Sequence, residues 1–262
     1  MRLSIEVELD YALERPADVL LQIEVAALPD QRIVAEALTV WSDTPIRAMP
    51  GEDGVGQRCW VHAVERCTAS YRATIDVERP RVRLADHPVT PVRLLSPELI
   101  AYVLPSRYCQ ADRFVGFVER EFAGLEGGVL AAALAGWVTD ALHYRSTGSS
   151  GDTTALDTFA TRRGVCRDYA HLLVALARAG GIPARCVSAY APGVDPPDFH
   201  AVAELWLGGG WHLVDATGMA SCRDLARVAV GRDATDIAFM TIFGEAELVR
   251  QQVRVVQERA PS

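Results

Sequence analysis

The chain has 262 residues, of which 50% are hydrophobic, and this size and composition are typical of a globular protein with a substantial core. Its net charge of −8 arises from acidic residues spread along the whole chain, and every basic residue is an arginine. This balance excludes the basic surface of a nucleic-acid-binding protein, so we expect no nucleic-acid partner.

We expect neither an export signal nor a membrane span. Residues 1–10 alternate apolar and polar side chains, which is typical of a strand and not of a signal peptide. The most apolar stretch, residues 129–138, is too short to cross a bilayer. The six cysteines include no CxxC pair, so we expect a cytoplasmic protein with reduced thiols and no membrane partner.

Residues 1–100 are predicted to form a β-rich domain. The alternation of a half-buried strand is favoured in residues 3–9, 19–25, 33–41, 59–64 and 70–77. Turn residues separate these segments, and a linker that contains Pro88, Pro91, Pro97 and Pro105 follows them. The pattern predicts an all-β domain that resembles a sandwich or a barrel.

Residues 101–262 change character and predict an α+β domain. Apolar residues at three-and-four spacing predict helices over residues 113–122, 129–144, 155–162 and 166–179. Strands are predicted over residues 184–190, 201–207 and 211–215. The tail is assigned to the same domain, with residues 247–256 forming a closing strand or helix.

Cys166 is the candidate nucleophile. It follows Gly164 and precedes a run with helical periodicity, which places it in the first turn of a helix. The N-terminus of a helix favours a negative charge and therefore the reactive thiolate. The backbone N–H of Cys166 has no partner within the helix at that position, so it can help to bind an oxyanion.

His200 and Asp215 are the candidate base and orienting carboxylate. If Gly208 and Gly209 form a two-residue hairpin turn, Leu207 faces Gly210 and the strands pair outward from there. In this register His200 and Asp215 lie on one face as diagonal neighbours, close enough for a hydrogen bond. A three-residue turn would put them on opposite faces, so the prediction depends on the register.

The remaining histidines with an interpretable position are predicted to be structural. His62 lies in a strand and His87 in the linker, while His171 is well round its helix from Cys166. His212 alternates with Asp215 onto the opposite face of its strand. None of these residues has the spacing of a metal site, so we expect neither a metal nor a cofactor.

Four segments resemble the bacterial transglutaminase-like superfamily: RRGVCRDYA at 162–170, GIPAR at 181–185, HA at 200–201 and WHLVDAT at 211–217. Upstream, YVLPSRYC at 102–109 is similar to the segment that precedes the catalytic domain in bacterial members with a β-rich N-terminal region. The resemblance implies a papain-like core in which Cys166 is the nucleophile, His200 the base and Asp215 the third member. For the second oxyanion donor that this fold implies, the candidates are Trp137 and Tyr190.

Three functions remain open at this point. The first is a cysteine peptidase or amidase that hydrolyses a peptide or side-chain amide through the Cys166, His200 and Asp215 triad. The second is a transglutaminase-type acyltransferase in which an amine replaces water, and the third is a catalytically silent binding or scaffold module. The expected partner of an enzyme of this kind is a peptide or protein amide substrate, and the sequence does not indicate an oligomeric state.

Overall fold

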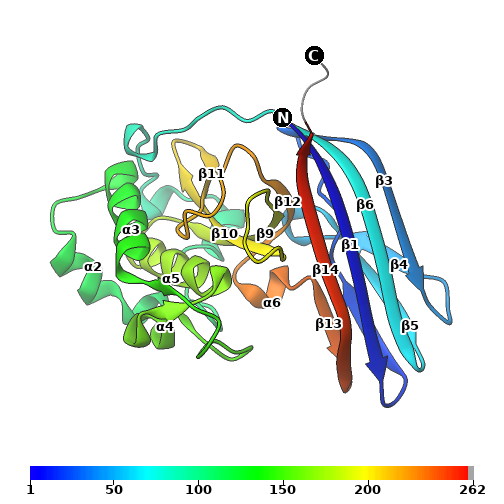
Figure 1. Ribbon diagram of the computed structural model, residues 1–262. Helices are drawn as coiled ribbons and strands as arrows, with labels where there is room; N and C mark the ends of the chain where they lie inside the picture. The colour runs from blue at the N-terminus through cyan, green and yellow to red at the C-terminus, as the bar shows by residue number, and fades with distance from the viewer. Residues whose placement is uncertain (259–262) are drawn as a thin grey trace.

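The computed structural model describes residues 1–258 and consists of two units that lie side by side (Figure 1). One unit, which we call the α+β unit, contains most of the helices and a small antiparallel sheet. The other, which we call the sandwich, contains two four-stranded sheets built mostly from the N-terminal part of the chain. The predicted fold class, a β-rich sandwich followed by an α+β core, is therefore confirmed.

The sandwich has four strands in each sheet. The first sheet has the order β14-β1-β6-β3, formed by Ala246–Glu258, Arg2–Leu13, Arg66–Val77 and Gln31–Trp41. The second has the order β13-β2-β5-β4, formed by Met240–Phe243, Ala17–Leu21, Gln57–Ala63 and Arg47–Pro50. Alternate residues of β1 are buried, among them Leu3, Ile5, Val7 and Leu9, as the period of two predicts. Each sheet has two free edges, so this unit is a sandwich and not a closed barrel.

The C-terminal strands complete the sandwich instead of extending the α+β unit. Strand β14 pairs with β1 in antiparallel register from Glu258 opposite Arg2, and β13 pairs with β2. The tail therefore forms strands, one of the two alternatives predicted for it. The start of β1 and the end of β14 consequently lie at the same end of the sandwich (Figure 1). The division of the chain at residue 100 stays a prediction.

The α+β unit is built around one sheet and one central helix. Its sheet has the order β11-β10-β9-β12, formed by Gly210–Val214, His200–Leu207, Ala184–Tyr190 and Ala226–Gly231. Its helices are α1 (Pro97–Ile100), α2 (Val115–Glu121), α3 (Gly127–Ala141), α4 (Ala155–Thr161), α5 (Cys166–Ala179) and α6 (Ala234–Ile237). Short 3-10 helices occur at Glu52–Gly54, Leu84–Asp86, Val92–Leu94 and Ala111–Arg113. Strand β12 has no counterpart among the predicted elements.

The predicted helix over residues 129–144 is too long. Helix α3 ends at Ala141, and His143–Tyr144 form a short strand, β7, that pairs in parallel with β8, Arg163–Gly164. The three-and-four spacing continues to Tyr144, but the backbone there pairs with residues that lie 20 positions further along the chain, and this pairing ends the helix early. The pairing places Tyr144 beside the turn that leads into α5.

Helix α5 is the centre of the α+β unit. Residues 168–178 of this helix are all buried, and the helix packs against α3, α4 and the sheet strands β9 and β10. The opposite face of the sheet contacts the sandwich, where the Tyr190 hydroxyl donates to the Ile23 carbonyl oxygen at 2.7 Å. Because close packing around residues 168–178 holds the helix in one place, it also fixes the position of the first residue, Cys166.

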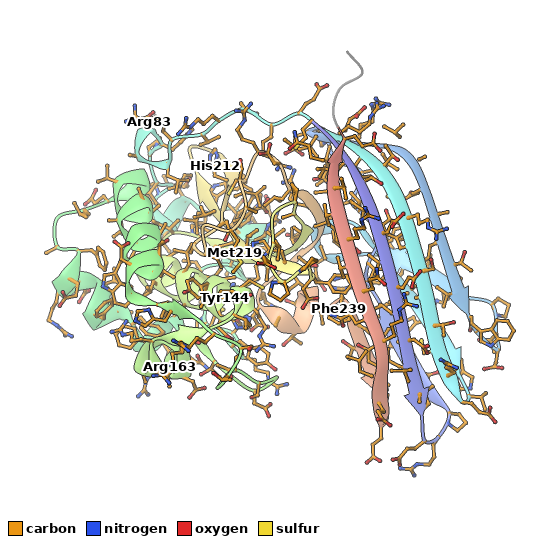
Figure 2. All side chains as sticks on the ribbon, in the orientation of Figure 1. Arg83, Tyr144, Arg163, His212, Met219 and Phe239 are labelled. Carbon is orange, nitrogen blue, oxygen red and sulfur yellow. The ribbon has the colours of Figure 1, made fainter. Side chains whose placement is uncertain are left out.

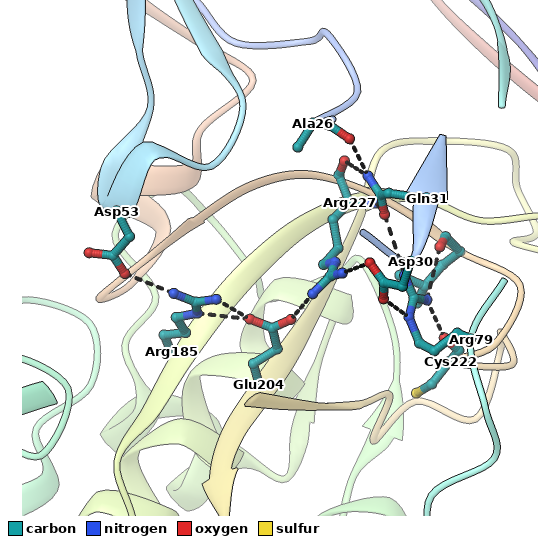
Figure 3. A network of polar contacts seen from close by, with 10 residues as sticks. Ala26, Asp30, Gln31, Asp53, Arg79, Arg185, Glu204, Cys222 and Arg227 are labelled. Atoms are coloured by element: carbon teal, nitrogen blue, oxygen red, sulfur yellow. Dashed lines mark hydrogen bonds and ion pairs between the residues drawn. The ribbon is translucent and has the colours of Figure 1, made fainter. Parts of the chain in front are cut away.

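A network of charged side chains joins the two units (Figure 3). Glu204 of β10 has no exposed surface and accepts from Arg185 at 2.8 Å and from Arg227 at 2.8 Å. Arg185 also donates to Asp53 of the sandwich, and Arg227 pairs with Asp30. Within residues 1–258, none of the helices is both long and apolar enough to cross a membrane.

Candidate active site

Cys166 is the first residue of α5, as predicted. Asp168 caps the helix start, because its Oδ2 atom accepts the backbone N–H of Val165 at 2.8 Å. A Cβ atom at Gly164 would lie 2.5 Å from the Asp168 Cβ atom, so only glycine fits beside this buried carboxylate. The cap therefore holds Cys166 at the positive end of the helix dipole, where a thiolate is favoured.

The β10–β11 hairpin has the predicted register. Leu207 pairs with Gly210 and Trp206 with Trp211, and Gly208 and Gly209 have φ values of 59° and 84°. Positive φ at both central residues is the requirement of a type I′ turn. The pairing continues outward to Ala203 opposite Val214, so the strands bring His200 and Asp215 to the same face.

His200 and Asp215 form the hydrogen bond that this register predicts. The His200 Nε2 atom lies 2.9 Å from Asp215 Oδ2, and both side chains are almost fully buried. Asp215 also accepts from the backbone N–H groups of Thr217 and Ala220, at 2.9 Å and 3.0 Å. Burial raises the pKa of Asp215, but these hydrogen bonds outweigh that effect and hold the pKa below its usual value. Asp215 is therefore a fixed carboxylate.

His200 also contacts the thiol of Cys166. Burial lowers the pKa of His200, but the hydrogen bond with Asp215 and the nearby Cys166 thiol outweigh it and raise the pKa to about 9. The second ring nitrogen, Nδ1, is buried and has no hydrogen-bond partner within residues 1–258. With Nε2 committed to Asp215, Nδ1 is the atom available to exchange a proton with the thiol. At neutral pH the ring is then an imidazolium, which favours a thiolate beside it.

Tyr144 is a site residue that the sequence did not indicate. Burial raises its pKa to about 12, and the nearby Cys166 thiol adds to this effect. The phenol group therefore lies near the thiol and the backbone of Cys166, with 38% of the residue exposed. A hydroxyl near the nucleophile is a candidate donor to an oxyanion formed there. The pairing of β7 with β8 is what brings Tyr144 to this position.

The two predicted candidates for this second donor are committed elsewhere. The Trp137 ring stacks with Phe159 at a centroid distance of 5.7 Å and lies under the guanidinium of Arg162. Tyr190 is fully buried and its hydroxyl is bonded to the Ile23 carbonyl oxygen in the contact between the two units. Both residues therefore belong to the core.

His212 lies away from the site, since its Nε2 atom bonds the Leu207 carbonyl oxygen at 2.9 Å and its ring packs against His87 at a centroid distance of 4.4 Å. His62 pairs with Asp18 in the sandwich. These contacts agree with the structural roles predicted for the three histidines.

A second cluster of potential metal ligands lies buried at the far side of α5. The sulfur atoms of Cys109 and Cys186 and a ring nitrogen of His171 lie within 4.8 Å of one another. Burial lowers the pKa of His171 to about 3, so its ring is neutral. The backbone N–H of Ala234 donates to Nε2 at 3.0 Å, so the ring proton lies on Nδ1. Neither nitrogen then offers a free lone pair, and we assign no metal to this cluster.

Cys166 and His200 open into a cleft of about 330 Å³. Half-buried apolar side chains line most of it, and they come from the sheet and from the segment that leads out of α6. The arrangement brings together the Cys166 thiol, the His200 ring and the Asp215 carboxylate that orients this ring. A thiol, an imidazole and a carboxylate are groups that acyl transfer through a thioester requires.

Comparisons with known proteins agree with this arrangement. A family model described as the transglutaminase-like superfamily matches residues 127–216. The crystal structure of a "putative cysteine protease" from Cytophaga hutchinsonii is 32% identical with a TM-score of 0.92, and the match covers 100% of this chain and 93% of that one.

Two other matches cover less of the chain. The uncharacterized protein ML0607 of Mycobacterium leprae is 32% identical over 143 residues, and the chain covers only 51% of that curated relative's length. The periplasmic domain of TgpA from Pseudomonas aeruginosa is 24% identical with a TM-score of 0.36, over 81% of this chain and 76% of that one. The stretch that the family model matches contains Cys166, His200 and Asp215.

Proposed function

The chain belongs to the transglutaminase-like superfamily, and on that premise we propose that it is a cysteine peptidase or amidase that hydrolyses a peptide or side-chain amide. The observation that carries the proposal is the position of His200, which bonds Asp215 through one ring nitrogen and faces the Cys166 thiol with the rest of the ring. We assign the roles of nucleophile, base and orienting carboxylate to Cys166, His200 and Asp215.

The reaction begins when the Cys166 thiolate attacks the carbonyl carbon of the amide. A C–S bond forms, and the carbonyl oxygen takes up the electron pair of its π bond as an oxyanion. The backbone N–H of Cys166 and the Tyr144 hydroxyl stabilise this charge.

The tetrahedral intermediate then expels its amine. The His200 imidazolium gives a proton to the leaving nitrogen, the C–N bond breaks, and a thioester remains on Cys166. The neutral imidazole next removes a proton from water, whose oxygen forms a C–O bond with the thioester carbon. The C–S bond then breaks, the acid is released, and Cys166 returns as the thiolate beside the imidazolium. Asp215 keeps the ring in one orientation throughout and stabilises its charged form.

The same thioester can react with an amine instead of water, so the acceptor separates a hydrolase from a transglutaminase-type enzyme. A panel of peptide and side-chain amides, incubated with and without a primary amine and followed by mass spectrometry, tests this point. We expect the free acid as the main product and no turnover by Cys166→Ala. A new amide bond would assign amine transfer, and turnover by the alanine variant would contradict the proposal.

The compartment is also part of the proposal. The six cysteines, Cys59, Cys67, Cys109, Cys166, Cys186 and Cys222, are all free thiols. Free thiols in this number support a reducing compartment, and we therefore place the protein in the cytoplasm. Recovery of the protein with a processed N-terminus in an exported fraction would overturn this placement.

A further inference from the structure

The sandwich fixes the segment that closes one side of the active-site cleft. We call this segment, residues 236–240, the strap, because it connects α6 to β13. The buried Gln22 donates its backbone N–H to the Phe239 carbonyl oxygen at 2.8 Å and its side-chain amide to the Asp236 carbonyl oxygen at 3.1 Å. Arg58 donates to the same Asp236 oxygen at 3.0 Å. The backbone of the strap is therefore bonded to strands of the other unit.

The side chains of the strap face the nucleophile across the cleft. Ile237, Ala238, Phe239 and Met240 line the same cavity as Cys166 and His200. Figure 2 labels Phe239 at the place where the α+β unit meets the strands of the sandwich. Phe239 and Met240 are only partly buried, so they present apolar surface to the cavity.

The wall continues on the sheet side. The Phe239 ring stacks on Phe199 with a centroid distance of 4.1 Å and an angle of 6° between the ring planes. Phe199 immediately precedes His200, so the two rings form one apolar surface next to the base. An apolar group that fills this space would displace water from aromatic and aliphatic surface, which is favourable.

The charged side chains of the cleft are committed to the protein itself. Arg167 donates to the Ser149 hydroxyl at 3.1 Å and to the Ser150 carbonyl oxygen. Asp198 accepts the backbone N–H of Phe199 and the side-chain amide of Gln251, each at 2.7 Å. These contacts hold loops in place and engage the Nη2 atom of Arg167 and the Oδ1 atom of Asp198. Most of the remaining lining of the cleft is apolar, which favours an apolar substrate side chain.

We propose that this cleft is a subsite for an apolar side chain of the acyl donor, and that Phe239 and Met240 determine its specificity. The inference rests on the proposed function and names its substrate class, a peptide with a large apolar residue on the acyl side of the reacting amide. It also gives the sandwich a role in the reaction, since the sandwich positions the strap through Gln22 and Arg58.

Peptidyl chloromethyl ketones that differ in one side chain test the proposal. The Cys166 thiolate displaces chloride from such a probe, which forms a C–S bond while chloride leaves with its electron pair. Leucine or phenylalanine on the acyl side should react at least about tenfold faster than aspartate or lysine at the same position. Equal rates across the four probes would overturn the proposal.

Variants of the strap then test its effect on probe selectivity separately from the reactivity of Cys166. Phe239→Ala and Met240→Ala should each lower the rate with the leucine probe about tenfold, while the rate with iodoacetamide, which carries no side chain, stays unchanged. Phe243→Ala is the matched control, because Phe243 is 61% exposed on β13 and does not line the cleft. Gln22→Ala should reduce the preference for leucine without changing the iodoacetamide rate. A leucine preference that survives in both strap variants would contradict their assigned role.

The iodoacetamide rate also distinguishes the two levels of the account. If Cys166 alkylates like an ordinary thiol and does not depend on His200, the proposed function fails. If Cys166 is activated but reacts at the same rate with every probe side chain, the proposed function stands and only the subsite proposal is refuted.

Discussion

Replacing Asp215 with asparagine is expected to lower the reactivity of Cys166 about tenfold at neutral pH. The pKa of His200 is about 9, compared with about 6.5 for an ordinary histidine. This difference corresponds to roughly 3.4 kcal/mol in favour of the imidazolium. Asp215 makes the largest contribution that raises this pKa, and burial works against it. Without the carboxylate this contribution is lost and the pKa of His200 falls, so a smaller fraction of the ring is protonated at pH 7.

The asparagine also disturbs the local hydrogen bonds. Asp215 Oδ2 accepts from His200 and from the Ala220 N–H, while Oδ1 accepts from the backbone and hydroxyl of Thr217. Asparagine has one oxygen, so its amide N–H groups face donors on one side or the other. The altered charge and the altered orientation both act on His200, and the tenfold figure is therefore a lower limit.

The assay is the rate of iodoacetamide alkylation at Cys166, located by peptide mass spectrometry and followed from about pH 5 to about pH 10. A Cys222→Ala background removes the other half-buried thiol. Asp195→Asn, in the exposed loop before His200, is the matched control and should react like the parent. If Asp215→Asn kept the parental rate and pH profile, the reasoning about Asp215 and His200 would be refuted.

Three other predictions follow from the same structure. Glu204→Gln should lower the free energy of unfolding, measured by urea titration, by about 3–5 kcal/mol, because it removes the charge of a buried carboxylate that accepts from two arginines. The control Asp86→Asn changes a side chain that is 61% exposed, and it should lower the free energy of unfolding by less than about 0.5 kcal/mol. The raised pKa of His200 means that its contribution to stability is fully present below about pH 6.5 and is lost as the pH rises through about 9. The stability difference between the parent and His200→Gln should therefore shrink by roughly 3 kcal/mol between about pH 6 and about pH 10, and a constant difference would count against the shift. Tyr144→Phe should lower kcat about tenfold to a hundredfold on an amide substrate with little change in KM, whereas an unchanged kcat would remove Tyr144 from the oxyanion site.

Local signals in the sequence were enough to predict the central part of the site. The helical periodicity after Cys166 placed the start of α5 correctly, because the run is long and its face is fully buried. The Gly208–Gly209 pair fixed the hairpin register, since few other residues adopt positive φ at both turn positions. The hairpin brings His200 and Asp215 together, and the packing of α5 against β10 then adds Cys166 to them.

The parts that the sequence did not reveal depend on contacts between distant segments. Tyr144 reaches the site through a pairing of two residues with two others, which is too short to leave a period in the sequence. Strand β14 buries little more than Val253, so its pattern did not show that it pairs with β1. The role of the strap depends on Gln22, which lies 217 residues before Phe239. Such relations become visible only in three dimensions.

The central claim, that Cys166 carries the acyl group, is tested most directly by trapping the acyl-enzyme. An activated ester such as p-nitrophenyl acetate, mixed rapidly with the protein and quenched in acid, transfers its acetyl group to the nucleophile and releases p-nitrophenolate. We predict a burst of one p-nitrophenolate per chain, with the acetyl group on Cys166 and a much smaller burst in His200→Ala. Acetylation at another residue, or an equal burst from Cys166→Ala, would contradict the account.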